Sequence, residues 1–305
     1  MHVNSAILLM AYGTPRSEQE IEPYLTDIRR GRKPNATEIQ DLKERYRKIG
    51  GSSPLLEITY CQASQLENKL FSEGLKTKVY VGMKHWHPLI SETVQEILNA
   101  GHQRIIGLVL APHYSKMSIG GYKKALDAAV GSTHNVSVDF IESWYDHPLF
   151  HKAVAERIDQ ALKKSTMSKI HVLFTAHSLP ERILKENDPY PEELLASCRY
   201  VAKSARLSNW SFAYQSAGQT GEKWLGPDII EALEGLSSKS KDISVLVVPI
   251  GFVSDHLEIL YDVDIEAKLF AETHGIKLER IESLNTQSTF IAALTDIVKK
   301  RISEG

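Results

Sequence analysis

The chain has 305 residues, of which 42% are hydrophobic and 24% are charged, and its formal net charge is −2. This composition is typical of an ordinary globular protein, so it excludes a disordered chain and gives no basis for nucleic-acid binding. No apolar run approaches the ~18 residues of a membrane-spanning helix, and a chain of this length is expected to form two domains.

The cysteines and the first residues indicate the compartment. Cys61 and Cys198 lack the clustered spacing of a disulfide framework, a zinc site or an iron–sulfur site. The apolar stretch that ends at Tyr12 is too short, and its start too uncharged, for a signal peptide. We therefore expect a cytoplasmic protein with no transmembrane segment.

Short apolar runs rich in β-formers alternate with longer segments of helical period. The predicted strands are residues 6–11, 78–83, 104–110, 136–141, 171–176, 211–215, 243–250 and 277–281. Apolar stripes at helical spacing follow at residues 90–98, 154–162 and 290–298. This alternation predicts an α/β fold with two similar Rossmann-like domains, each a four-stranded parallel sheet flanked by helices.

The two halves of the sequence also resemble each other. Residues 9–15 match residues 174–180, because in each a strand leads into an Ala-X-small-X-Pro segment. We expect domains at residues 1–163 and 164–285, with a terminal helix at 286–305 packing back on the first. Ligands bind beyond the carboxyl ends of parallel strands, so we expect Tyr12 and His177 on opposite walls of an interdomain cleft that forms the active site.

His177 and an acidic helix are candidates for a metal site. A neutral imidazole at a strand end can bind a metal or accept a proton. Ser254 can cap a helix on which Glu258, Asp262 and Glu266 recur every four residues, which stacks their carboxylates on one face. Imidazole with carboxylate suits ferrous iron. From the residues alone, a structural histidine and a solvated acidic helix face remain alternatives.

A basic region lies in the amino-terminal half. Residues 28–34 are rich in arginine, and Arg45-Tyr46 and the glycine-serine loop at 50–55 follow. Guanidinium groups and such a loop suit carboxylates or phosphates, yet neither a Walker-type loop nor G-x-G-x-x-G follows the first strand. The pattern indicates an anionic organic substrate rather than a nucleotide, with a solvated helix end as the alternative.

The second strand ends in residues 84–88, Lys-His-Trp-His-Pro. Histidines at i and i+2 share one face of an extended chain, so His85 and His87 are able to chelate a metal jointly. Two histidines without a neighbouring cysteine or carboxylate make an incomplete site. We therefore interpret Lys84 and His85 as pocket residues and His87 as structural.

Six segments of this chain resemble the ferrochelatase family, in family order and along essentially the whole sequence. They are residues 11–15, 41–46, 110–115, 176–180, 224–227 and 251–258. Within the family, the chain resembles the coproporphyrin III ferrochelatases of Gram-positive bacteria. It lacks the cysteine-rich carboxyl-terminal extension and the hydrophobic lip of the mitochondrial enzymes, which favours a soluble substrate with four propionates.

The resemblance implies a lyase of heme biosynthesis that inserts Fe(II) into coproporphyrin III, giving coproheme and releasing two protons. Protoporphyrin IX is the alternative substrate, and a cobalt or nickel chelatase or a non-catalytic tetrapyrrole or iron carrier are more remote alternatives. Ferrous iron is then a substrate, no organic cofactor is expected, and the enzyme is expected to be a monomer. Its expected partners are the porphyrin, iron and a downstream heme-pathway enzyme.

The resemblance also implies roles for individual residues. His177 and Glu258 hold the incoming iron, and His177, expected to be neutral near pH 7, also accepts pyrrole protons. Asp262 and Glu266 match a carboxylate line for a second, magnesium-like ion. Tyr12 matches a tyrosine that approaches the metal from the other porphyrin face. Contacts to the macrocycle and its carboxylates are implied for Arg29, Arg45, Tyr46, Ser53 and Tyr122.

Overall fold

A computed structural model describes residues 4–131, 136–218, 221–238 and 243–304, and the ends of the expected domains at residues 1–3 and 305 lie outside these ranges. The chain divides into two compact units. The first comprises residues 1–144, 254–256 and 285–305, and the second comprises residues 145–253 and 257–284. Within the described residues, no helix is both long and apolar enough to cross a membrane.

The first unit contains a four-stranded parallel sheet in the order β2-β1-β3-β4. Its strands are β1 (Ser5–Ala11), β2 (Lys78–Met83), β3 (Arg104–Val109) and β4 (Ser137–Ile141). From Ala6 to Met10 every side chain of β1 is fully buried, as expected of a central strand that is covered on both faces.

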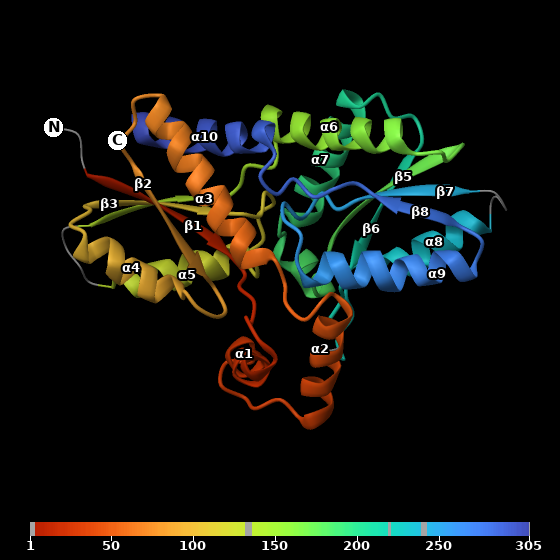
Figure 1. Ribbon diagram of the computed structural model, residues 1–305, viewed down its shortest axis with the longest axis horizontal. Helices are drawn as coiled ribbons and strands as arrows, with labels where there is room; N and C mark the ends of the chain where they lie inside the picture. Colours follow the sequence, from red (N-terminus) through yellow and green to blue (C-terminus); the bar gives the residue numbers. More distant parts are fainter. Residues whose placement is uncertain (1–3, 132–135, 219–220, 239–242, 305) are drawn as a thin grey trace. The chain divides into compact units, whose positions relative to one another are not determined.

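Four helices cover the two faces of this first sheet, α3 (Leu55–Ser72), α4 (Ile90–Asn99), α5 (Ile119–Val130) and α10 (Ser288–Ser303) (Figure 1). The helices α1 (Ile21–Ile28) and α2 (Ala36–Lys48) contact each other away from the sheet, and the 3₁₀ turn η1 lies at Glu18–Glu20. Alternate residues of β1, namely Ala6, Leu8 and Met10, pack against α4 and α5. The helices α3 and α10 contact each other on the opposite face.

The second unit repeats this arrangement with the strand order β6-β5-β7-β8. Its strands are β5 (Ile170–His177), β6 (Trp210–Gln215), β7 (Ser244–Val248) and β8 (Lys277–Arg280). Its helices are α6 (Pro148–Lys164), α7 (Tyr190–Ser204), α8 (Ile229–Ser237) and α9 (Lys268–Thr273), with the 3₁₀ turn η2 at Glu181–Glu186 and a π-helix η3 at Ile259–Ala267. The predicted pair of similar four-stranded parallel sheets is thus confirmed.

The boundary between the units lies at Trp144–Tyr145 rather than at residue 163. The reason is that α6 packs against α7 of the second unit. The strand predicted to run to Ile250 ends at Val248, because Pro249 has no N–H to continue the ladder.

The acidic segment is helical from Leu257 to Thr273, but its central part η3 is a π-helix. In it Ile259, Val263 and Ala267 are buried in the core beneath the second sheet. In a π-helix each backbone hydrogen bond spans five residues instead of four, so every turn of η3 is wider than a turn of an α-helix. The helix does not start at Ser254, whose hydroxyl accepts a hydrogen bond from Gln62 at 2.9 Å instead.

Candidate active site

His177 is the last residue of β5, and the backbone around it is fixed from several sides. Its carbonyl oxygen accepts the hydroxyl hydrogen of buried Tyr190 at 2.9 Å. Ser178 donates its N–H to the carbonyl of Gln215 at 2.8 Å and its hydroxyl to that of Leu225 at 2.8 Å. The imidazole Nδ1 donates to the Ser178 carbonyl, so Nε2 is the nitrogen left for other chemistry.

The nitrogen Nε2 of His177 lies 3.4 Å from Oε1 of Glu258, and the two side chains are 31% and 32% exposed. Burial by itself lowers the pKa of His177. The charge of Glu258 and a hydrogen bond to it have the larger, opposite effect, and they raise this pKa to about 9. The imidazole is therefore protonated at pH 7. This corrects the expectation of a neutral ring, because that expectation did not include the effect of the Glu258 charge on the pKa of His177.

The three carboxylates of the acidic helix have different environments. Glu258 is half-buried, Asp262 is buried and Glu266 is exposed. One oxygen of Asp262 accepts a hydrogen bond from the hydroxyl of Ser216, the residue after β6, whose φ is +60°. Across the described residues, no group of three or more His, Cys, Asp or Glu side chains is placed to hold a metal ion.

In the first unit, aromatic and basic residues gather where β1 and β2 end. Tyr12 is 43% exposed. Its ring lies 4.8 Å from that of His85, whose Nδ1 contacts Asp27 Oδ2 at 2.8 Å. The ammonium of Lys84 lies 4.9 Å from the centre of the Tyr122 ring. The structure thus brings together four of the predicted porphyrin-binding residues, Tyr12, Lys84, His85 and Tyr122.

Electrostatics in this cluster favour an anion. Burial lowers the pKa of Lys84, and the nearby charge of Arg30 lowers it further. Burial also lowers the pKa of His85, although the hydrogen bond to Asp27 opposes that change. Cations that are partly desolvated and close to one another gain from a bound carboxylate, which supplies the missing counter-charge.

The remaining predicted residues lie at the end of α1, on α2 and in the loop before α3. Arg29 forms an ion pair with Glu38, and Arg45 is half-buried on α2. Tyr46 is buried, and its hydroxyl shares a hydrogen bond of 2.8 Å with Thr14, two residues beyond Tyr12. The Ser53 hydroxyl accepts the N–H of Leu55 at 3.3 Å and so marks the start of α3.

The segment after β2 leaves the extended conformation in which His85 and His87 would share a face. Trp86 has a φ of +96°, so the chain is not extended between His85 and His87. The two histidines contact different carboxylates, and His87 Nδ1 lies 2.9 Å from Glu92 in the first turn of α4. The joint chelate that the i, i+2 spacing allowed is therefore not formed.

A contact that the sequence does not indicate anchors this segment. The indole Nε1 of Trp86 donates a hydrogen bond to Glu20 at 2.7 Å. Hydrogen bonds from Arg16 lower the pKa of Glu20 from its ordinary 4.5 to about 2, so the carboxylate is charged. The pairing joins residues far apart in the sequence, so no local pattern indicates it.

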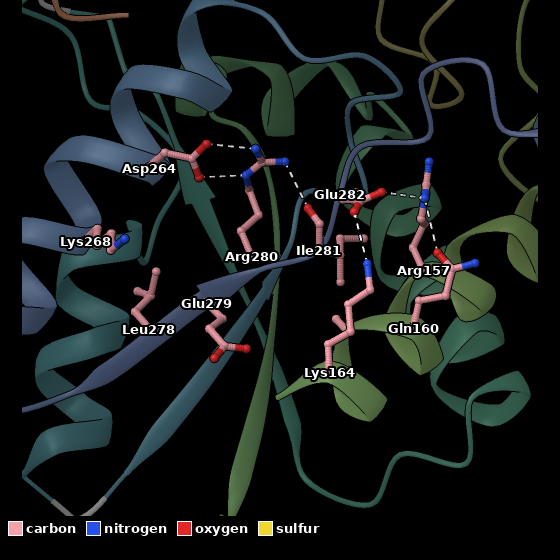
Figure 2. Close-up of a pocket in the computed structure, with 11 residues that line it drawn as sticks. Arg157, Gln160, Lys164, Asp264, Lys268, Leu278, Glu279, Arg280, Ile281 and Glu282 are labelled. Atoms are coloured by element: carbon pink, nitrogen blue, oxygen red, sulfur yellow. Dashed lines mark hydrogen bonds and ion pairs between the residues drawn. The ribbon is translucent and has the colours of Figure 1, made fainter. Parts of the chain in front are cut away.

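A cavity of about 470 Å³ lies at the open edge of β8 in the second unit (Figure 2). Its lining comes from α6, η3, α9 and the residues of and after β8, and it includes Arg157, Lys164, Asp264, Arg280 and Glu282. None of the predicted site residues lines it. We therefore assign the chemistry to the strand ends and not to this cavity.

Comparisons with known proteins show the family of this chain. A family model described as Ferrochelatase matches residues 4–302. A ferrochelatase of Herpetosiphon aurantiacus is 46% identical, over 98% of this chain and 99% of that protein. Coproporphyrin III ferrochelatases of Halalkalibacterium halodurans and Geobacillus kaustophilus are 40% and 41% identical over 98% of this chain, and the matches cover 97% and 96% of those proteins.

Solved chelatase structures share the fold. SirB from Bacillus subtilis with Fe³⁺ has a TM-score of 0.61 at 10% identity, over 98% of this chain and 95% of that one. CbiX, described as the terminal enzyme of siroheme biosynthesis in denitrifying bacteria, has a TM-score of 0.54 at 11% identity, over 97% and 98%. These likenesses concern the fold alone. With the family match over nearly the whole sequence, the chain belongs to the ferrochelatase family, the metal-chelating lyases of heme biosynthesis.

Proposed function

We propose that this ferrochelatase inserts Fe(II) into coproporphyrin III, with His177 and Glu258 delivering the iron. The observation that carries the proposal is the 3.4 Å approach of His177 Nε2 to Glu258 Oε1 at the carboxyl end of β5. A borderline imidazole and a hard carboxylate together suit ferrous iron. Both side chains are about a third exposed, so an ion can reach them from solvent.

Two protein ligands are enough for an ion that is a substrate. A structural metal site closes its coordination shell with protein groups, whereas a catalytic site keeps positions open. Here the four ring nitrogens of the porphyrin take the iron over. This accounts for a site that, within the described residues, has no larger group of metal-binding side chains.

The same two residues accept the two protons that the porphyrin releases. Iron that binds His177 Nε2 displaces the proton held there, since the pKa of His177 is about 9 in the metal-free site. When iron then moves to the ring, its bonds to His177 and Glu258 break, four Fe–N bonds form and two pyrrole N–H bonds break. The freed imidazole takes one of these protons and the Glu258 carboxylate takes the other, and both later pass to solvent.

The basic and aromatic cluster of the first unit supports a flat substrate with several carboxylates. In the cluster Lys84 supplies positive charge, and Tyr12 and Tyr122 supply rings. Elsewhere in the first unit Arg45 and Arg29, which pairs with Glu38, add two cations. Arginine suits a propionate because its planar fork matches two carboxylate oxygens. The four propionates of coproporphyrin III can pair with more of these cations than the two of protoporphyrin IX. In addition, relatives at 40% and 41% identity carry the name coproporphyrin III ferrochelatase.

We assign Asp262 and Glu266 to a second, magnesium-like ion as part of the same proposal. Buried Asp262 and exposed Glu266 lie four residues apart on η3, and oxygen ligands suit a hard cation. Loss of this ion is expected to change the rate of iron delivery and to leave porphyrin binding unchanged.

The test is ferrous iron insertion by the purified protein without oxygen, followed by the loss of porphyrin fluorescence. Coproporphyrin III and protoporphyrin IX are compared side by side at matched concentrations. The proposal predicts a larger kcat/KM for coproporphyrin III. A preference for protoporphyrin IX would assign the protein to the other substrate class, and binding without turnover would indicate a carrier.

A further inference from the structure

Arg280, at the end of β8, forms an ion pair with Asp264 of the π-helix η3. Its Nε lies 2.7 Å from Oδ1 of Asp264 and its Nη2 lies 2.8 Å from Oδ2, so the two side chains pair through both oxygens (Figure 2). The remaining nitrogen Nη1 donates to the Ile281 carbonyl at 2.9 Å and to the Ser283 hydroxyl at 3.3 Å. The Arg280 side chain is only 12% exposed, and all three of its guanidinium nitrogens have hydrogen-bond partners.

Asp264 lies in the segment that carries the iron-binding carboxylate. It follows Glu258 by six residues, and buried Ile259 and Val263 seat another face of η3 on the sheet. Long π-helices are rare, so neighbouring contacts have to maintain the wide turn. Apolar packing holds η3 against the sheet, but it is non-directional. Directional contacts such as ion pairs are therefore needed to prevent η3 from sliding or rotating on the sheet.

We propose that Arg280 is a positioning residue that holds Asp264, and through it η3, so that Glu258 stays opposite His177. The proposal rests on the proposed function, which assigns iron delivery to Glu258 and His177. A guanidinium fork suits this task because two parallel N–H···O bonds fix orientation as well as distance. Lysine would keep the charge but lose the second contact.

The same cavity offers a matched control. Arg157 on α6 pairs with Glu282 at 2.8 Å and is 15% exposed, so it resembles Arg280 in burial and in partner type. This second pair joins α6 to the chain after β8 and does not contact η3 (Figure 2). Its removal tests whether the loss of another arginine–carboxylate pair at this cavity has the same effect.

The experiment compares Arg280→Gln, Arg280→Lys, Asp264→Asn, the double variant Asp264→Asn/Arg280→Gln and Arg157→Gln with the wild type. Steady-state kinetics give kcat/KM for ferrous iron and, separately, the KM for porphyrin. Amide hydrogen exchange in residues 257–273 is measured without iron or porphyrin. This second readout does not depend on activity.

We expect Arg280→Gln and Asp264→Asn each to lower kcat/KM for iron about tenfold and to leave the porphyrin KM unchanged, as for groups that orient metal ligands. The double variant should lose no more than either single variant, because both remove one interaction. Arg280→Lys should recover part of the loss. Exchange should quicken in residues 257–273 in these variants and stay slow in Arg157→Gln.

The proposal is overturned if Arg280→Gln and Asp264→Asn are folded and keep the wild-type kcat/KM for iron. It is also overturned if Arg157→Gln loses as much as they do. If the wild type itself inserts no iron, the proposed function fails, and exchange alone then decides: unchanged protection in residues 257–273 overturns the role of Arg280, and faster exchange in that segment supports it.

Discussion

At the residue scale, His177 holds either a proton or a metal. Burial lowers the pKa of His177, but Glu258, with smaller contributions from the Ser178 carbonyl and Asp262, raises it from its ordinary 6.5 to about 9. A raised pKa means that the pair stabilises the fold fully below about pH 6.5 and loses this contribution as pH rises through 9. Iron competes with that proton, so iron affinity should rise with pH over the same range.

Glu258→Gln tests this account of the histidine. Removing the carboxylate charge removes the main cause that raises the pKa of His177, so its titration midpoint should fall from about 9 toward or below 6.5. The measurement is an NMR pH titration of the His177 ring in the metal-free protein, with Asp255→Asn as a control on the same stretch of chain. An unchanged midpoint in Glu258→Gln would show that Glu258 does not set it.

At the element scale, the ends of the strands are fixed by close backbone packing. Gly13, just after β1, has a φ of +101°, and a Cβ added there would lie 1.8 Å from the carbonyl oxygen of His85. His85 in turn donates its N–H to the carbonyl of Tyr12 at 2.7 Å. The loops after β1 and β2 therefore place Tyr12 and His85 together only when residue 13 lacks a side chain.

Gly13→Ala is expected to destabilise the protein strongly and to weaken porphyrin binding. Gly74→Ala is the control, because Gly74 has a φ of +84° with no atom near its missing Cβ. The control should lose about 1–2 kcal/mol, the cost of a left-handed backbone for alanine. Urea unfolding measures both losses, and equal losses would contradict the role of the close approach at Gly13.

Most elements could be predicted from apolar periodicity, while features set by distant partners could not. The strands and the apolar stripes of α4, α6 and α10 follow directly from their spacing. The π-helix could not be predicted because residues that recur every four positions share one face of an ordinary α-helix as well. Ser254 was wrongly predicted to cap a helix, and the contact of Trp86 was not predicted at all. In both cases the partner, Gln62 or Glu20, lies far away in the sequence.

At the scale of the whole molecule, the duplication places equivalent residues at equivalent strand ends. Tyr12 follows β1 and His177 ends β5, and these strands occupy the same position in their sheets. The sequence repeat could predict this because both halves keep the Ala-X-small-X-Pro segment. The unit boundary could not be predicted, since it depends on which neighbour α6 packs against.

The chain ends by returning to the unit in which it began. On α10 the side chains of Phe290, Leu294 and Val298 are fully buried, and this helix packs against α3 in the first unit. Leu294→Ala should therefore cost about 2–5 kcal/mol. Leu269→Ala is the control, because Leu269 is 60% exposed.

Amide hydrogen exchange assigns that loss to a unit. Leu294→Ala should speed exchange in β1 and β3, which share the first unit with α10, and Leu269→Ala should not. Equal protection of β1 and β3 in both variants would show that α10 does not support the first sheet.

The central claim is that His177 and Glu258 deliver iron to a porphyrin that other residues bind. Single-turnover insertion of ferrous iron into coproporphyrin III, without oxygen, tests it in the wild type, His177→Ala and Glu258→Gln, with porphyrin affinity measured by fluorescence in the same samples. The account predicts that insertion falls by at least about 100-fold in both variants, as for groups that ligate the metal, while porphyrin affinity is unchanged. Full insertion by His177→Ala would contradict it.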